Sequence, residues 1–169
     1  LLDHSSSIDE YELEYKKATV ALCEALKFLN VKFSAYAFST KNKKVTCWVI
    51  KHPDVKWTSI NARNLVQIKA SGGRPLAEIY NLLLPLMKTY KPDIMITLTD
   101  GEPSDYNAVR STIKTYKLNG IHMVAVGMGK TVNNAINIGL NLKYLEYERT
   151  LVVSQLDEIP KRVLSLLQV

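Results

Sequence analysis

The sequence predicts a doubly wound α/β fold, with a mostly parallel central sheet, one antiparallel edge strand and helices on both faces. Three continuous apolar runs, over residues 92–100, 121–129 and 150–154, are typical of strands that are buried on both faces. Segments with helical periodicity separate these runs along the chain. Strands that alternate with helices in this way predict a parallel sheet between two helical layers.

The remaining elements follow from the same patterns. Residues 31–38 alternate apolar with small or polar side chains, and residues 44–50 follow after a polar turn, so the two segments predict a hairpin that supplies the antiparallel edge strand. Apolar residues recur at helical spacing over residues 9–30, 75–90, 106–118 and 155–168. Pro85 is expected to kink its helix. Residues 55–70 fit either a short helix or a strand.

Length and composition describe one globular domain. The 169 residues are read as a single domain, 1–169, excised from a longer protein, because the chain starts within an apparent strand. Apolar residues make up 47% and charged residues 22%, and no apolar run is long enough to span a membrane. Cys23 and Cys47 form no disulfide framework or zinc motif, so they are expected to be free thiols of a reducing, intracellular compartment.

Three loops at predicted strand ends carry polar side chains suited to a binding site. The first is Asp3-His4-Ser5-Ser6-Ser7, the second Ser71-Gly72-Gly73-Arg74-Pro75, and the third Thr99-Asp100-Gly101-Glu102-Pro103-Ser104. Ligands of open α/β sheets bind beyond the carboxyl ends of the strands, where the strand order reverses. We therefore expect the three loops to converge there, although each alone would be read as a turn.

This ordered set resembles the von Willebrand factor type A (VWA) family. The D-x-S-x-S motif is formed by Asp3, Ser5 and Ser7, and the later D-G by Asp100 and Gly101. The "GGRPLAEIY" stretch and the tail from "VAVGMG" to "RVLSLL" are similar to the later parts of that family, so the resemblance covers nearly the whole chain. It implies a metal-ion-dependent adhesion site (MIDAS) with Asp3, Ser5, Ser7 and Asp100 as ligands of Mg²⁺ or Mn²⁺.

The chemistry of Mg²⁺ fits these residue types, but one position departs from the family. Mg²⁺ prefers six oxygen ligands in octahedral geometry, some of them water, and an open position would accept a carboxylate from a partner. Arg74 stands where the family has a threonine ligand, and a guanidinium cannot coordinate a metal. Arg74 either swings outward, which leaves a weaker site of four protein ligands or one that uses Ser71, or pairs with Asp3 or Asp100 and replaces the cation. A solvent-facing loop arginine is the third alternative.

The resemblance predicts a non-enzymatic, intracellular protein-binding module. Its partner is expected to offer a carboxylate to Arg74, Ser71 and Glu102 beside the metal, and an adaptor role for a MoxR-type AAA+ ATPase is the specific form of this hypothesis. Two alternatives remain. One is nucleic-acid binding through scattered lysines, since the net charge is +6. The other is a metal-free VWA scaffold in which Arg74 replaces the cation. Catalysis is not expected, because the three histidines, His4, His52 and His122, lie on unrelated segments. His122 lies within a predicted strand and is expected in the core.

Overall fold

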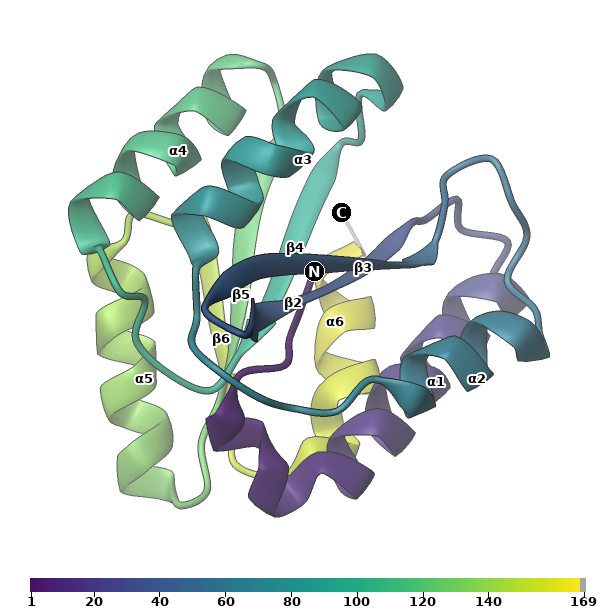
Figure 1. The fold of residues 1–169 in the computed structure, drawn as a ribbon, viewed down its shortest axis with the longest axis horizontal. Helices are drawn as coiled ribbons and strands as arrows, with labels where there is room; N and C mark the ends of the chain where they lie inside the picture. Colours follow the sequence, from purple (N-terminus) through teal and green to yellow (C-terminus); the bar gives the residue numbers. More distant parts are fainter. Residues whose placement is uncertain (168–169) are drawn as a thin grey trace.

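The computed structural model describes residues 1–167, which form a six-stranded sheet in the order β3-β2-β1-β4-β5-β6 (Figure 1). All neighbouring strands are parallel except β2 and β3, which form an antiparallel hairpin at one edge. The strands are β1 (Leu2–Asp3), β2 (Ala35–Lys41), β3 (Lys44–Lys51), β4 (Ile94–Thr99), β5 (His122–Met128) and β6 (Arg149–Val153). The predicted fold class is confirmed.

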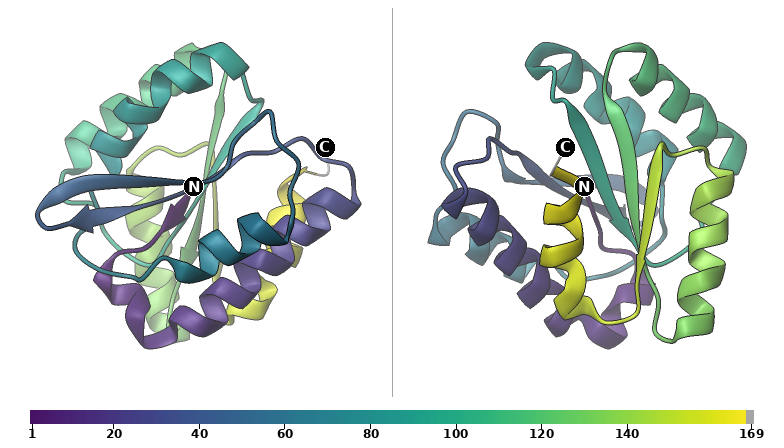
Figure 2. Two further views of the ribbon diagram at one scale, coloured as in Figure 1. Left: turned by 45° about the vertical axis from the view of Figure 1, so that its right-hand side comes forward. Right: turned by 180° about the vertical axis from the view of Figure 1, so that it is seen from behind.

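Helices cover both faces of the sheet, three on each (Figures 1 and 2). One face packs against α1 (Glu12–Phe28), α2 (Ser59–Gln67) and α6 (Ile159–Leu167), and the other against α3 (Leu76–Tyr90), α4 (Tyr106–Leu118) and α5 (Val132–Tyr144). Short 3₁₀ turns, η1 (Ser6–Tyr11) and η2 (Leu156–Glu158), precede α1 and α6. Within residues 1–167, no helix is long and apolar enough to cross a bilayer.

Each side of the sheet has its own apolar core. Leu22, Leu65 and Val163 are buried on the side of α1, α2 and α6, whereas Leu83 and Ile113 are buried on the side of α3, α4 and α5. Strand β5, which lies between β4 and β6, contributes alternately to both cores, as expected for a strand covered on both faces. This double packing holds the strand ends, and hence the loops that follow them, in fixed positions.

The local predictions are mostly confirmed, with differences that have physical reasons. Residues 59–67 are helical, which settles the ambiguous segment, and Thr58 and Asn61 cap this helix reciprocally. Pro85 lies within α3 and does not end it. Because proline has no N–H, the Asn81 carbonyl loses its helical donor. Both residues are exposed, so water can satisfy that carbonyl. His122, expected in the core, lies instead at the exposed start of β5 beside Glu148. Residues 168–169 of the predicted last helix lie outside the described residues.

The strand order places the polar loops together at the carboxyl ends of the strands. The carboxyl ends of β1 and β4, at Asp3 and Thr99, are neighbours at the point where the order reverses. The connection from α2 to α3, which contains Arg74, crosses the same edge (Figure 1). The topology therefore brings the beginning, middle and later parts of the chain together.

Candidate functional site

The first loop fixes the Asp3 carboxylate below the surface. Asp3 is fully buried at the end of β1. The Ser5 backbone N–H donates to Asp3 Oδ1 at 2.8 Å, and the Thr99 hydroxyl at the end of β4 donates to Asp3 Oδ2 at 2.6 Å. Both bonds hold the carboxylate in one orientation.

The second loop depends on its glycines to reach the site. Gly72 has φ +67°, and a Cβ there would lie 2.0 Å from the Thr40 carbonyl oxygen, so no other residue fits. The Gly73 N–H donates to the Thr40 hydroxyl at 2.6 Å, and the Ser71 N–H donates to the His4 carbonyl at 2.9 Å. These contacts attach the loop to β2 and to the first loop, immediately before Arg74.

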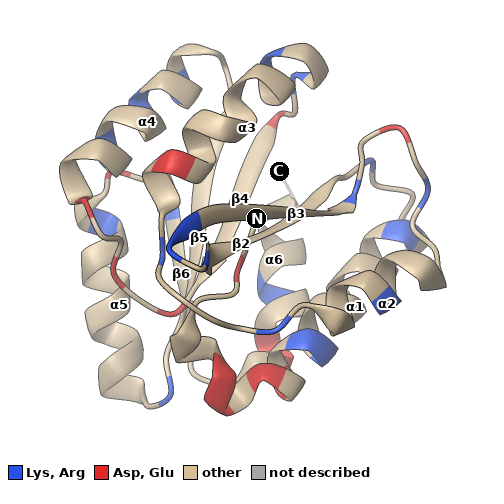
Figure 3. Ribbon diagram, viewed as in Figure 1, with Lys and Arg blue, Asp and Glu red and all other residues tan. Residues whose placement is uncertain are grey.

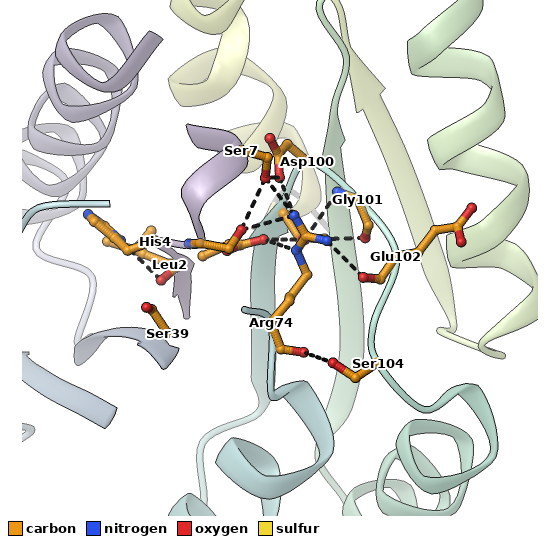
Figure 4. A network of polar contacts seen from close by, with 12 residues as sticks. Leu2, His4, Ser7, Ser39, Arg74, Asp100, Gly101, Glu102 and Ser104 are labelled. Carbon is orange, nitrogen blue, oxygen red and sulfur yellow. Dashed lines mark hydrogen bonds and ion pairs between the residues drawn. The ribbon is translucent and has the colours of Figure 1, made fainter. Parts of the chain in front are cut away.

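The guanidinium of Arg74 lies at the centre of the three loops (Figure 4). Its Nε donates to Asp3 Oδ2 at 2.5 Å. Its Nη2 lies 2.6 Å from Asp100 Oδ1, 2.7 Å from Ser7 Oγ and 2.9 Å from Ser5 Oγ. Its Nη1 donates to the Glu102 carbonyl at 2.7 Å. One side chain thus joins all the oxygen groups that the sequence predicts as metal ligands.

Two further residues complete the packing around Arg74. Gly101 lies against the guanidinium, and a Cβ at this position would be 2.7 Å from Arg74 Nη1. The Tyr11 hydroxyl, at the end of η1, donates to Asp100 Oδ2. Asp100 therefore accepts bonds from Arg74, Ser7 and Tyr11, and its side chain is only 4% exposed.

Electrostatics hold the arginine charged within this cluster. Burial opposes the positive charge, but the carboxylates of Asp3 and Asp100 outweigh burial and raise the pKa of Arg74 above its usual value. Burial and the hydrogen bond to Asp100 raise the pKa of Tyr11, so its hydroxyl remains a donor. One guanidinium faces two carboxylates, which leaves one negative charge in excess at the centre.

The residues present do not fit a metal ion while Arg74 holds this position. Nη2 is 2.6–2.9 Å from three oxygens that a cation would need within about 2.0–2.1 Å, so nitrogen and metal exclude one another. In the part of the chain that the structure describes, no three His, Cys, Asp or Glu side chains are arranged to hold a metal.

The structure places the predicted site residues as follows. Asp3, Ser5, Ser7 and Asp100 all contact Arg74 through their side chains. Glu102 contributes its carbonyl, and its carboxylate instead accepts from Asn141 of α5 at 2.5 Å. Ser71 is attached through its backbone: its N–H donates to the His4 carbonyl, and its carbonyl accepts from the Ser39 hydroxyl.

The sequence placed Thr99 and Gly101 in the third loop without assigning either a contact in the cluster, and it did not indicate Tyr11. Thr99 and Gly101 flank the predicted ligand Asp100, and that adjacency was the available signal. Tyr11 lies eight positions after Asp3 in a segment predicted as ordinary helix. The 3₁₀ geometry of η1 turns Tyr11 toward Asp100, and nothing in its spacing indicates this.

The fold has counterparts among solved structures. Proximal thread matrix protein 1 (PTMP1) from the mussel byssus superposes with a TM-score of 0.69 over 98% of this chain, at 14% sequence identity. A structure of PTMP1 with a zinc-occupied MIDAS motif gives 0.68 at 16% identity. The VWA domain of SpRpn10 gives 0.63 at 10% identity, covering 95% of this chain and 91% of that domain.

These similarities establish the fold, which is that of VWA domains, and identities of this size establish nothing finer. The chain spans less than half of PTMP1, 43% of its length in the first comparison. No family model matches the sequence, and a search of curated proteins finds no significant match. The chain is thus defined by its VWA fold and by a strand-end cluster centred on an arginine.

Proposed function

We propose that the chain is a non-enzymatic protein-interaction module in which Arg74 takes the position of the MIDAS cation. The observation that carries the proposal is the bonding of Arg74 Nη2 to Ser5, Ser7 and Asp100 together. The zinc-occupied MIDAS of PTMP1, a protein with the same fold, supports the assignment of this strand-end position as the functional edge. The SpRpn10 VWA domain supports a protein partner by analogy of fold.

Replacing a cation by arginine changes what the site offers to a partner. A divalent cation balances two carboxylates and retains open coordination positions. Arg74 leaves an excess negative charge, and four of its five N–H groups are engaged by protein oxygens. A partner carboxylate would therefore gain little here. We propose that Arg74 cross-links the three loops and that partner contacts are made by the surfaces beside them.

Two competing hypotheses keep a more direct role for the site. In the first, Arg74 swings outward and Asp3, Ser5, Ser7 and Asp100 bind Mg²⁺ or Mn²⁺. In the second, Arg74, Ser71 and Glu102 capture a carboxylate of the partner. An AAA+ ATPase as that partner and an intracellular setting remain predictions of the sequence resemblance.

The placement of the three histidines supports the proposal that the module is non-enzymatic. His4 is buried beside Tyr15, and burial lowers the pKa of His4. His52 lies near Asp54 in the loop after β3. His122 pairs with Glu148 at the amino end of β5, whereas the site lies at the carboxyl ends of the strands. None of the three contacts a serine or cysteine that a base of this kind would activate.

The experiment that tests the proposal compares the wild-type chain with Arg74→Thr. The free energy of unfolding is measured by chemical denaturation, either with about 5 mM Mg²⁺ or with EDTA. We expect the wild type to give equal values, because its cation is a side chain. Arg74→Thr should be less stable in EDTA, since two buried carboxylates lose their partner, and should regain stability with Mg²⁺.

The matched control is Arg162→Thr, which replaces an exposed arginine of α6. The unfolding free energy of this variant should be the same with Mg²⁺ as with EDTA. A wild-type chain that gains stability from Mg²⁺, and loses that gain in Asp100→Asn, would overturn the proposal in favour of the metal form. An Arg74→Thr chain that is as stable as wild type in EDTA would show that the guanidinium does not hold the cluster.

A further inference from the structure

A groove of about 620 Å³ lies between the edge strand β3 and the end of α2. Trp48 and Ile50 of β3 and Ile68 after α2 supply its apolar part, and Lys41 and Lys69 are exposed at its margins. The groove adjoins the connection from α2 to α3, which continues to Arg74. Ser71 lies between the groove and the cluster, and the bonds of the Arg74 guanidinium go to residues outside the groove lining.

The outer edge of β3 is available for pairing. In the described part of the chain β3 has a strand neighbour, β2, on one side only. The Asn61 side-chain amide, from α2, already donates to the Ile50 carbonyl at 3.0 Å, so an added chain would pair with the part of β3 that precedes Ile50. Unpaired edge backbone groups are templates for an added extended chain, a common mode of peptide recognition.

The charge of the groove selects an acidic occupant. Lys41 pairs with Lys44 across the hairpin, and cross-strand partners project from the same face. By strand alternation that face is also the face of Trp48, which points toward the groove. Lys41 and Lys69 line the groove, Lys44 lies beside Lys41 on the same face of the hairpin, and no acidic residue is among the groove lining. A peptide with carboxylates beside a large apolar side chain complements this arrangement.

A polypeptide fits the groove better than a nucleic acid. Trp48 is half-buried against the core on the side of α1 and α2, so its indole is not a free platform for stacking a base. The rest of the apolar lining is aliphatic, and the groove contains no arginine. An exposed strand edge adds backbone hydrogen bonds that a phosphate chain cannot reproduce.

We infer that this groove binds an acidic, extended peptide segment of a partner protein, which lies alongside β3 with an apolar side chain on Trp48 and Ile68. Its carboxylates face Lys41, Lys44 and Lys69. The inference rests on the proposed protein-interaction function and locates the contact outside the arginine cluster.

The test begins with selection from a random 12-residue peptide library displayed on phage, using the 169-residue chain as bait. The most enriched peptide is synthesised, and its Kd is measured by fluorescence anisotropy for three proteins. These are the wild type, Lys41→Glu/Lys69→Glu, and the control Lys88→Glu/Lys161→Glu. The control reverses two exposed lysines of α3 and α6 and changes net charge equally.

We expect enriched peptides to combine acidic residues with a large apolar residue. Binding should weaken by at least about tenfold in Lys41→Glu/Lys69→Glu and change little in the control, because a reversed rim charge acts on its immediate neighbours. Amide hydrogen exchange in β3 should slow when the peptide is added. Circular dichroism of each variant establishes that the fold is retained.

Three results would overturn the inference, and they separate it from the proposed function. Peptides that bind equally to the groove variant would place the interaction on another surface while leaving an interaction module intact. A library that yields no binder would count against both. Tighter binding of a dT12 oligonucleotide, steeply salt-dependent and lost in Lys41→Glu/Lys69→Glu, would assign the groove to nucleic acid instead.

Discussion

The cluster around Arg74 and the groove beside β3 lie on the same connection between α2 and α3, yet they use polar groups in opposite ways. In the cluster, nearly every donor and acceptor is engaged within the chain, and the side chain of Arg74 is only 13% exposed. At the groove the lysines are exposed, and within residues 1–167 no strand pairs with the outer edge of β3. Figure 3 shows basic residues at the tip of the β2–β3 hairpin. The Arg74 cluster, whose polar groups are bonded to one another, holds the three loops together. The groove beside β3 keeps polar groups that a partner could bind.

The largest effect is expected when the cluster loses its only cation. Arg74→Gln leaves Asp3 and Asp100 buried without a positive partner, a change that costs about 3–5 kcal/mol for a buried ion pair. Chemical denaturation measures this loss. The groove counterpart, Lys69→Gln, should change the free energy of unfolding by no more than about 0.5 kcal/mol. Equal losses in the two variants would contradict the distinction between the regions.

A smaller loss is expected when one carboxylate of the cluster is neutralised. Asp3→Asn keeps the shape of the side chain but removes the charge that Arg74 and Thr99 contact. Hydrogen bonds to charged groups are worth about 1.5–3 kcal/mol, and the unfolding free energy should fall by that amount. Asp157→Asn, in the short turn before α6, is the exposed control. No measurable difference between the two would indicate that the Asp3 side chain does not hold Arg74 and Thr99 in the folded chain.

An added methyl group tests how closely the guanidinium is packed. Gly101→Ala would put a Cβ 2.7 Å from Arg74 Nη1, and such overpacking costs about 1–3 kcal/mol. Gly73→Ala is the matched control, because a Cβ there makes only an ordinary contact at 3.6 Å with Thr40. Thermal unfolding of the two variants should therefore differ by several degrees. A reversed order would mean that Arg74 does not lie against Gly101.

The smallest effect on folding is expected at the groove. Lys41→Gln and Lys44→Gln remove exposed charges from the hairpin and should leave stability within about 0.5 kcal/mol of wild type. Their effect should appear instead in the salt dependence of peptide binding, which weakens as rim charges are removed. Stability losses as large as those at Arg74 would show that these lysines hold the hairpin together.

The fold was predictable because apolar periodicity records it directly. The buried runs that became β4, β5 and β6, and the helix at residues 106–118, needed no information from distant residues. The ends of helices and strands and the burial of individual side chains were harder to predict from sequence, because contacts with distant segments decide them. His122 looks like a core residue in an apolar run, but its position at the first residue of β5 leaves it in solvent.

The candidate site was predictable in its members but not in its centre. The motif residues Asp3, Ser5, Ser7 and Asp100 could be named from spacing, and Arg74 was visible as a departure from the family. Whether Arg74 turned inward or outward depended on contacts with Gly101 and Glu102, which no local pattern encodes. Tyr11 and the β3 groove depend on the packing of segments far apart in sequence, so sequence reasoning did not find them.

A positive charge that is part of a side chain has one consequence that a bound ion does not. It is present in every folded copy as soon as the polypeptide is made, and no chelator can extract it. If Arg74 takes the position of the cation as we propose, fluctuations in the supply of free magnesium should leave these loops unchanged. Such a domain would not be regulated by metal availability, and its loop geometry would be set by the polypeptide alone.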